Sequence, residues 1–386
     1  MNNTPLTIPD TAIPDTPKKR ERNYGIDLLR LVAMLMVVTL HVLGYGGVLD
    51  SITPFTLKSE VFWSLEILCF GAVNIYAIIS GIVGYKSRHR SSGLIYTCLQ
   101  VLFLSVVITV IDIIMLSRQG TPITFSYVFF NIFPSIRLQW YFSAYFCLFF
   151  FMPLIDKAIE LTPRRTLKVL ALFCFLVFCC WSQYESYVAG LRQGYSVIWL
   201  AILYGLGAYI AKYDPLKKWK SWQCLLAFLG SIAITVASHV LIGKFLRGVI
   251  KTDLLVQYTS PTMVVGAVFL VSAFAKLNFK HNAPKKIISV LAPLSLGVYL
   301  IHCHPILAGK MTRLFWDKAG YEFLHVGKFQ IWYGLLIVVC SALAIFAICL
   351  CLDGLRYLFF KLIRVKKFSE WLEKIFKKIT KPIIGE

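Results

Sequence analysis

Residues 26–42 read IDLLRLVAMLMVVTLHV, an apolar run in which Asp27, Arg30 and His41 are the only ionisable side chains. The run continues to residue 47, so it is long enough to cross a bilayer as a helix, which takes about 20 residues. Nine further apolar runs follow it, at residues 61–84, 94–117, 138–156, 166–184, 195–211, 221–243, 255–277, 287–308 and 329–352. We therefore expect an all-α integral membrane protein, a polytopic bundle of about ten transmembrane helices.

The composition excludes the other common classes of protein. Of the 386 residues, 58% are hydrophobic and 15% are charged, whereas soluble domains carry about 25% charged residues. The net charge of +21 would suggest a nucleic-acid partner for a soluble protein, but here we expect the lipid bilayer as partner and no nucleic acid. The eleven cysteines form no CxxC and no Cys/His metal spacing, so we expect buried free thiols and no metal.

The distribution of Lys and Arg predicts how the chain crosses the membrane. Most of these cations fall in segments on the same side as the N-terminus, and cytoplasmic segments are the ones that carry excess positive charge. Both termini are therefore expected in the cytoplasm. We divide the chain into a disordered basic tail at residues 1–24, a ten-helix membrane domain at 25–352, and a basic amphipathic helix at 353–386 that lies on the anionic inner leaflet.

The ionisable residues of the first span lie on one stripe of the helix. Arg30 and His41 are 11 residues apart, so steps of about 100° return them to nearly the same face, about 16 Å apart along the axis. Asp27 is three residues before Arg30 and can pair with it. Arg30 is therefore either an interfacial cation or part of a site. His41, deep in the span, is either a helix-packing residue or a functional one.

This stripe also carries a family resemblance. The IDLLR motif, with a histidine eleven positions after its arginine, resembles the first helix of the membrane-bound acyltransferase 3 family. Three later segments resemble further helices of that family in the expected order: 73-VNIYAIISGIVGYKSR-88, 139-QWYFSAYFCLFFFMPLI-155 and 295-SLGVYLIHCHPIL-307. Family members have ten spans with both ends inside, and they include O-acyltransferases that modify bacterial surface polysaccharides. The resemblance implies such a multi-pass enzyme in the cytoplasmic (inner) membrane.

The resemblance also implies an acyl coenzyme A donor, with acetyl as the expected group and no permanently bound cofactor. Lys86, Arg88 and Arg90 follow the second span on its inner side. They are either plain positive-inside charge or the site for the donor's phosphates, since arginine binds phosphate through two parallel hydrogen bonds. The family has an arginine pair near this position, and the Arg88-x-Arg90 spacing leaves open which two of the three residues take that role.

Further candidates lie in the outer half of the bundle. His302 is as deep in the ninth span as the histidine of the first span is in its own, so the two rings are expected to line one cavity, unless Tyr299 and His302 bond to neighbouring helices instead. Trp140 and Tyr141 stand where the fourth span meets the outer surface, as an aromatic belt or as a stacking surface for a sugar. Glu66 lies within the second span, as a partner of the histidine or of an acceptor hydroxyl.

We therefore expect an O-acyltransferase that moves an acyl group from cytoplasmic acyl coenzyme A to an extracytoplasmic hydroxyl, on a cell-surface polysaccharide or its lipid-linked precursor. His41 either removes the acceptor's proton as a general base or accepts the acyl group itself, and Arg30 and His302 complete the catalytic set. Polysaccharide-assembly proteins are the expected protein partners. The alternative is a transporter or flippase on the same helical fold, because buried charges and many spans suit both.

Overall fold

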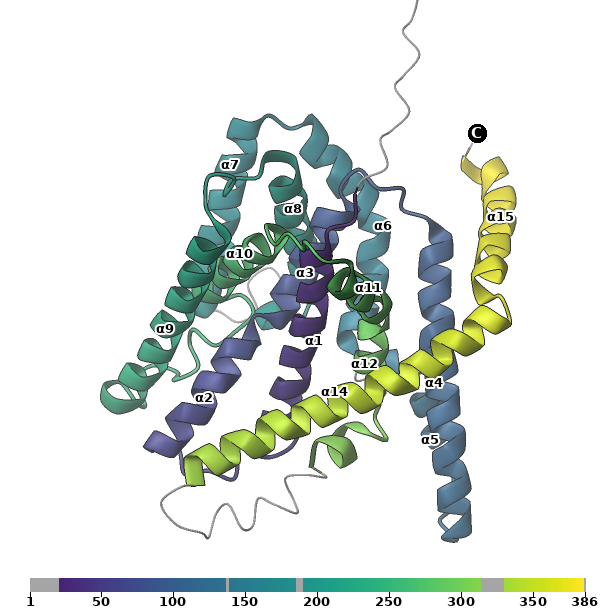
Figure 1. The fold of residues 1–386 in the computed structure, drawn as a ribbon, viewed down its shortest axis with the longest axis horizontal. Helices are drawn as coiled ribbons and strands as arrows, with labels where there is room; N and C mark the ends of the chain where they lie inside the picture. The colour runs from purple at the N-terminus through teal and green to yellow at the C-terminus, as the bar shows by residue number, and fades with distance from the viewer. Residues whose placement is uncertain (1–20, 137–138, 185–189, 314–329, 385–386) are drawn as a thin grey trace, which may run out of the picture.

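The computed structural model describes residues 21–136, 139–184, 190–313 and 330–384, and in these ranges it is helical without strands (Figure 1). Most of the predicted tail at residues 1–24 lies outside the described residues. The helices are α1 (Tyr24–Leu43), α2 (Leu57–Phe70), α3 (Ala72–Gly84), α4 (Ser91–Arg118), α5 (Phe125–Ile132), α6 (Trp140–Leu161), α7 (Arg164–Cys174), α8 (Val197–Tyr213), α9 (Ser221–Phe245), α10 (Pro261–Ala275), α11 (Asn282–Leu291), α12 (Ser295–His302), α14 (Gln330–Leu362) and α15 (Val365–Ile384).

The helices account for the predicted spans. Among the described residues, eight helical stretches are long and apolar enough to cross a membrane. Two shorter apolar helices, α8 and α10, coincide with the predicted sixth and eighth spans. Three of the long stretches are interrupted: α2 continues into α3, α7 into a π-helical turn at Phe175–Cys180, and α11 into α12. The polytopic helical bundle is therefore confirmed, with a helix at each predicted span.

Polar side chains and one proline explain where several helices begin. Asn23, Thr56 and Ser196 each accept a hydrogen bond from a backbone N–H in the first turn of the helix that follows, namely α1, α2 and α8. These bonds satisfy N–H groups that have no partner inside the helix. Pro261 is the first residue of α10, where its missing N–H removes no helical hydrogen bond.

The bundle is packed around α1, which carries the predicted catalytic stripe. This helix contacts α2, α3, α10, α12 and α14, and most of its residues are buried. The most extensive contact between two described helices joins α3 to α8, where Gly81 faces Gly207. A Cβ atom on Gly81 would stand 2.0 Å from the carbonyl oxygen of Tyr204, so this approach requires a residue without a side chain.

The last span is longer than predicted. α14 continues past residue 352 to Leu362 and crosses the other helices diagonally (Figure 1). It carries Asp353, Arg356 and Lys361 beyond that point. The first two neutralise each other, because Arg356 makes hydrogen bonds of 2.8 and 2.6 Å to the two carboxylate oxygens of Asp353. Gln100 and Tyr96 of α4 bond to the same buried pair. A fully bonded ion pair lets an apolar helix continue where a count of charges predicts its end.

α15 follows α14 after a sharp turn and packs along α4. The Glu373 carboxylate accepts hydrogen bonds from Ser92 in the first turn of α4. These bonds, together with Lys377 at 3.0 Å, lower the pKa of Glu373. Phe368 and Trp371 are exposed, so no other described part of the chain covers this aromatic side of α15.

The bundle has two chemically different ends, which we name by their residues. The basic end is the place where α3 ends and α4 begins, and it carries Lys86, Arg88 and Arg90. The histidine end is the opposite one, where α1 ends just after His41 and α12 ends at His302 (Figure 1).

Candidate functional site

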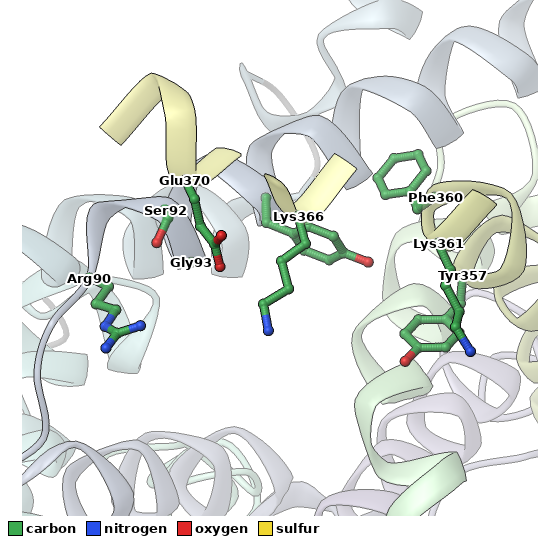
Figure 2. A pocket seen from close by; sticks show the side chains of 9 residues that line it. Arg90, Ser92, Gly93, Tyr357, Phe360, Lys361, Lys366 and Glu370 are labelled. Carbon is green, nitrogen blue, oxygen red and sulfur yellow. The ribbon is translucent and has the colours of Figure 1, made fainter. Parts of the chain in front are cut away.

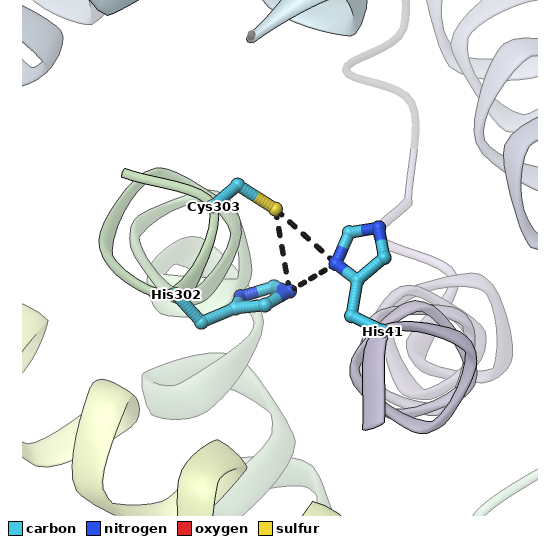
Figure 3. A group of neighbouring side chains, drawn as sticks. All are labelled: His41, His302 and Cys303. Atoms are coloured by element: carbon cyan, nitrogen blue, oxygen red, sulfur yellow. Dashed lines mark hydrogen bonds between the residues drawn. The ribbon is translucent and has the colours of Figure 1, made fainter. Parts of the chain in front are cut away.

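His41 and His302 are in direct contact at the histidine end (Figure 3). α1 packs against α12, and Nδ1 of His41 lies 2.9 Å from Nε2 of His302, although the two residues are 261 positions apart. His302 is fully buried, whereas His41 is half-buried. The sequence predicts two histidines at a similar depth, and the fold joins them as a hydrogen-bonded pair.

The neighbours of His302 determine where the protons lie. Nδ1 of His302 is 2.5 Å from the carbonyl oxygen of Val298, and a carbonyl oxygen can only accept, so Nδ1 carries the hydrogen. In a neutral ring Nε2 is then an acceptor, and it accepts from the Nδ1–H of His41. The proton of His41 is thereby held on Nδ1. Its Nε2 keeps a free lone pair, and Figure 3 shows this nitrogen pointing away from His302.

Cys303 is a neighbour of this pair that the sequence analysis did not single out. Its Sγ lies 3.3 Å from Nδ1 of His41 and 3.4 Å from Nε2 of His302. The thiol is buried, and it follows His302 directly in the chain. The other neighbour, His304, is also buried but bonds to the carbonyl oxygen of Asn131, at 3.0 Å. The His-Cys-His sequence at residues 302–304 marks Cys303 as a neighbour of His302, but it does not predict the contact with His41 of α1.

Arg30 lies on the same helix as His41, closer to the basic end. It pairs with Asp27 at 2.8 Å, as the spacing of three residues predicts. Asp27 also accepts from Arg22, at 2.5 Å. The Arg30 side chain is 30% exposed, so the guanidinium is held in place by a carboxylate while one side of it stays open.

A chain of aromatic rings connects Arg30 to His302. The hydroxyl of Tyr76 donates to the backbone carbonyl of Arg30 at 2.5 Å. The ring of Tyr141 lies 6.3 Å from that of Tyr76 and 6.2 Å from that of Tyr299, and Tyr299 lies 6.4 Å from the His302 ring. Tyr141 and Tyr299 therefore lie along the interior between the two ends, whereas the sequence placed Tyr141 at the outer surface.

Trp140 belongs to an aromatic cluster that the sequence did not reveal. Its ring lies 4.9 Å from Tyr195, and Tyr195 lies 4.9 Å from Tyr258. Gln139, just before Trp140, donates to the carbonyl oxygen of Leu300 at 3.1 Å, so this cluster is fixed to the helix that carries His302. Tyr195 and Tyr258 stand in loops just before α8 and α10, where no motif marks them.

Glu66 lies beside this aromatic cluster. It is buried, and one of its carboxylate oxygens has no hydrogen-bond partner in the described part of the chain. Phe70, one turn further along the same face of α2, has its ring 4.9 Å from Tyr258. No hydrogen bond links Glu66 to His41 within the described ranges.

The basic end presents three cations on a loop that is held from inside. Lys86, Arg88 and Arg90 are exposed, and no described acidic side chain lies within salt-bridge distance of them. His89, between the two arginines, turns inward and contacts Asp156 at 2.8 Å. Asp156 also accepts from the hydroxyl of Tyr204, at 2.9 Å. This inward contact fixes the loop to α6 and α8 while the three cations stay available.

A cavity of about 440 Å³ opens beside Arg90 (Figure 2). It lies where the beginnings of α4 and α15 meet the end of α14, and Figure 2 shows Arg90 and Lys366 reaching toward its open space from separate walls. Aromatic side chains and cations share its lining, which consists of Arg90, Ser92, Gly93, Tyr96, Tyr357, Phe360, Lys361, Lys366 and Glu370.

The predicted site residues therefore fall into two groups. The pair of histidines, Tyr299 and Tyr141 are joined through ring contacts, and Trp140 and Glu66 border them. The three exposed cations lie at the other end of the bundle. α1 and the aromatic chain both run from the histidine group toward the basic end, and Arg30 lies roughly 16 Å from His41 along α1.

The family assignment rests on most of the chain. A family model described as an acyltransferase domain matches residues 23–354. This range begins just before α1, ends within α14, and contains every predicted site residue. No curated protein and no solved structure matches the chain. The chain thus belongs to the acyltransferase 3 family and is a multi-pass membrane acyltransferase.

Proposed function

We propose that this protein transfers an acyl group, expected to be acetyl, from cytoplasmic acyl coenzyme A to a hydroxyl of an extracytoplasmic acceptor, a cell-surface polysaccharide or its lipid-linked precursor. The observation that carries the proposal is the orientation of the His41 ring. His302 holds its Nδ1–H and leaves Nε2 with a free lone pair. A ring fixed in this way is the arrangement that general-base catalysis needs.

In the proposed reaction, Nε2 of His41 removes the proton of the acceptor hydroxyl while that oxygen attacks the thioester carbonyl carbon. The carbon–sulfur bond then breaks, and His41 returns the proton to the departing sulfur of coenzyme A. His302 acts as a positioning residue, because it contacts the His41 ring at Nδ1 and not at the reacting Nε2. The second route, in which Nε2 takes the acyl group first and passes it on, uses the same nitrogen.

The donor is proposed to bind at the basic end. Its phosphates are too strongly charged to enter hydrocarbon cheaply. Lys86, Arg88 and Arg90 are exposed there, and no described acidic side chain lies within salt-bridge distance of them. The cavity beside Arg90 adds aromatic surface next to cations, which suits a nucleotide. The neutral acyl–pantetheine arm would pass Arg30 and follow the aromatic chain toward His41.

The acceptor is proposed to approach from the histidine end. The clustered rings of Trp140, Tyr195 and Tyr258 offer apolar faces to a sugar ring. The unpartnered carboxylate oxygen of Glu66 can accept a hydrogen bond from a sugar hydroxyl, and this bond would offset the cost of its burial. Tyr45, whose ring is 4.9 Å from His41, is exposed, so this side of the histidine pair is open.

Sealed membrane vesicles test the direction of transfer. Radiolabelled acetyl coenzyme A added to inside-out vesicles should label an acceptor trapped in the lumen, whereas right-side-out vesicles should stay unlabelled. Vesicles that carry His41→Ala are the matched control and should give no label in either orientation. Label that appears only on acceptors on the same side of the vesicle membrane as the added donor would contradict the trans-bilayer direction. Mass spectrometry of surface glycans from cells with and without the gene identifies the acceptor.

A further inference from the structure

Three metal-ligand atoms converge at the histidine end (Figure 3). Nδ1 of His41, Nε2 of His302 and Sγ of Cys303 all lie within 4.8 Å of one another. The separations are 2.9 Å between the two nitrogens, and 3.3 and 3.4 Å from the sulfur to each nitrogen. The sequence predicts no metal because no Cys/His spacing suggests one, and the three atoms come together only through the packing of α1 against α12.

The triangle has the dimensions of one face of a zinc tetrahedron. Zinc binds imidazole nitrogen at about 2.0–2.1 Å and thiolate sulfur at about 2.3 Å, which puts two nitrogens about 3.4 Å apart and a nitrogen and a sulfur about 3.6 Å apart. The observed nitrogen–sulfur distances fall within 0.3 Å of that value, as 3.3 and 3.4 Å. The two rings, at 2.9 Å, need to part by only about half an ångström.

The surroundings also suit a zinc ion. A metal-binding histidine usually donates its other N–H to a carbonyl or carboxylate, which fixes the ring, and His302 donates in this way to Val298. Two imidazoles and a thiolate favour zinc over magnesium or calcium, which prefer oxygen ligands. His41 is half-buried, so an ion has access from the surface. Three protein ligands leave the fourth coordination position open.

We propose that His41, His302 and Cys303 form a zinc site, and that zinc bound there switches off acyl transfer. On binding, the Cys303 thiol loses its proton to solvent and coordinates as the thiolate. The hydrogen on Nδ1 of His41 must also leave, so the neutral ring carries its one proton on Nε2 instead. That nitrogen then has no lone pair with which to act as a base or nucleophile. The inhibition rests on the proposed function of His41, whereas the binding of zinc does not.

Binding is tested on the purified full-length protein in detergent, without reference to activity. After metal removal and titration with zinc, elemental analysis should find one tightly held zinc per chain. Cobalt(II) in its place should give a thiolate-to-cobalt absorption band. Cys303→Ser should lose the band and bind zinc at least about ten-fold more weakly, the lower bound for disturbing a metal's surroundings. Cys224→Ser, which replaces a buried cysteine of α9, is the matched control and should behave as wild type.

Inhibition is tested by titrating zinc into the acyl-transfer assay and expressing each rate as a fraction of that variant's own metal-free rate. Wild type and Cys224→Ser should be inhibited, and a chelator should restore the rate. Cys303→Ser should need at least about ten-fold more zinc. Equal zinc sensitivity or equal cobalt spectra in Cys303→Ser and wild type would overturn the site. If zinc binds to the wild type without inhibiting it, both the zinc switch and the role of His41 as a free base are wrong. If the wild type binds no zinc but His41→Ala is inactive, the zinc site alone is wrong.

Discussion

Replacing His302 with alanine tests whether the histidine pair works as a unit. In the structure His302 accepts one hydrogen bond from Nδ1 of His41 and donates one to Val298. Without this ring, His41 can rotate or carry its proton on Nε2. Leaving the Nδ1–H of His41 without its hydrogen-bond acceptor costs about 1–3 kcal/mol. This cost corresponds to a fall in kcat of about 5- to 150-fold. His41→Ala removes the base itself, and we expect it to cost at least about 10²-fold.

Two further variants separate positioning from a general loss of structure. In His302→Gln the side-chain amide oxygen can accept from Nδ1 of His41, so part of the lost kcat should return. The double variant His41→Ala/His302→Ala should be no slower than His41→Ala alone, because His302 is proposed to act only through the His41 ring. The KM for the donor should change little, since the donor's phosphates are proposed to bind at the opposite end.

Steady-state kinetics with acetyl coenzyme A and a defined acceptor measure these effects, on variants whose melting temperatures match the wild type. A wild-type kcat in His302→Ala would refute the positioning role. Losses that multiply in the double variant would show that the two histidines act independently, which the 2.9 Å contact argues against.

Three other predictions address different parts of the chain. Arg88→Ala/Arg90→Ala should raise the KM for acyl coenzyme A and not that for the acceptor, by an amount equivalent to about 1.5–3 kcal/mol, the scale of charged hydrogen bonds. An unchanged donor KM would show that both arginines serve only as positive charge on the inner side of the membrane. Gly81→Leu should lower the free energy of unfolding by about 1–3 kcal/mol or more in a thermal melt, because its Cβ would meet a carbonyl oxygen at 2.0 Å. Gly93→Leu is the control and should not lower it, because no atom lies within 4 Å of a Cβ at that position. The pKa of Glu373 is lowered from 4.5, so its stabilisation of α15 is complete above that value and is lost as the pH falls through the lowered pKa. Protease cleavage of α15 should rise in that acidic range in wild type and be independent of pH in Glu373→Gln; identical profiles would show that this carboxylate does not hold the helix.

The sequence predicts the positions and order of the apolar helices because the length of an apolar run is a local property. It also predicts the Arg30–Asp27 pair, because residues three apart on a helix face each other. It does not predict that α14 continues past residue 352, since the Asp353–Arg356 pair is made acceptable by Gln100, which comes from another helix.

The same distinction applies to the candidate site. The two histidines share a depth that can be counted along each span, but their contact at 2.9 Å depends on how α1 and α12 pack. Cys303, Tyr195 and Tyr258 were missed because each gains its meaning from residues far away in the chain. An isolated cysteine or tyrosine in an apolar segment has no periodicity or spacing to mark it.

In the proposed function, the separation of Arg30 from His41 along α1 lets one bundle join a charged donor to an acceptor on the other side. A bare charge at the bilayer centre costs several kcal/mol, so the phosphates of the proposed donor would gain by staying with the exposed arginines while only a neutral arm enters. The aromatic chain from Tyr76 to Tyr299 offers that arm an apolar path. The half-buried His41 ring at its end must stay open to admit a hydroxyl. The same opening would admit a metal ion to the neighbouring thiol, so the proposed catalysis and the proposed zinc binding compete for one imidazole.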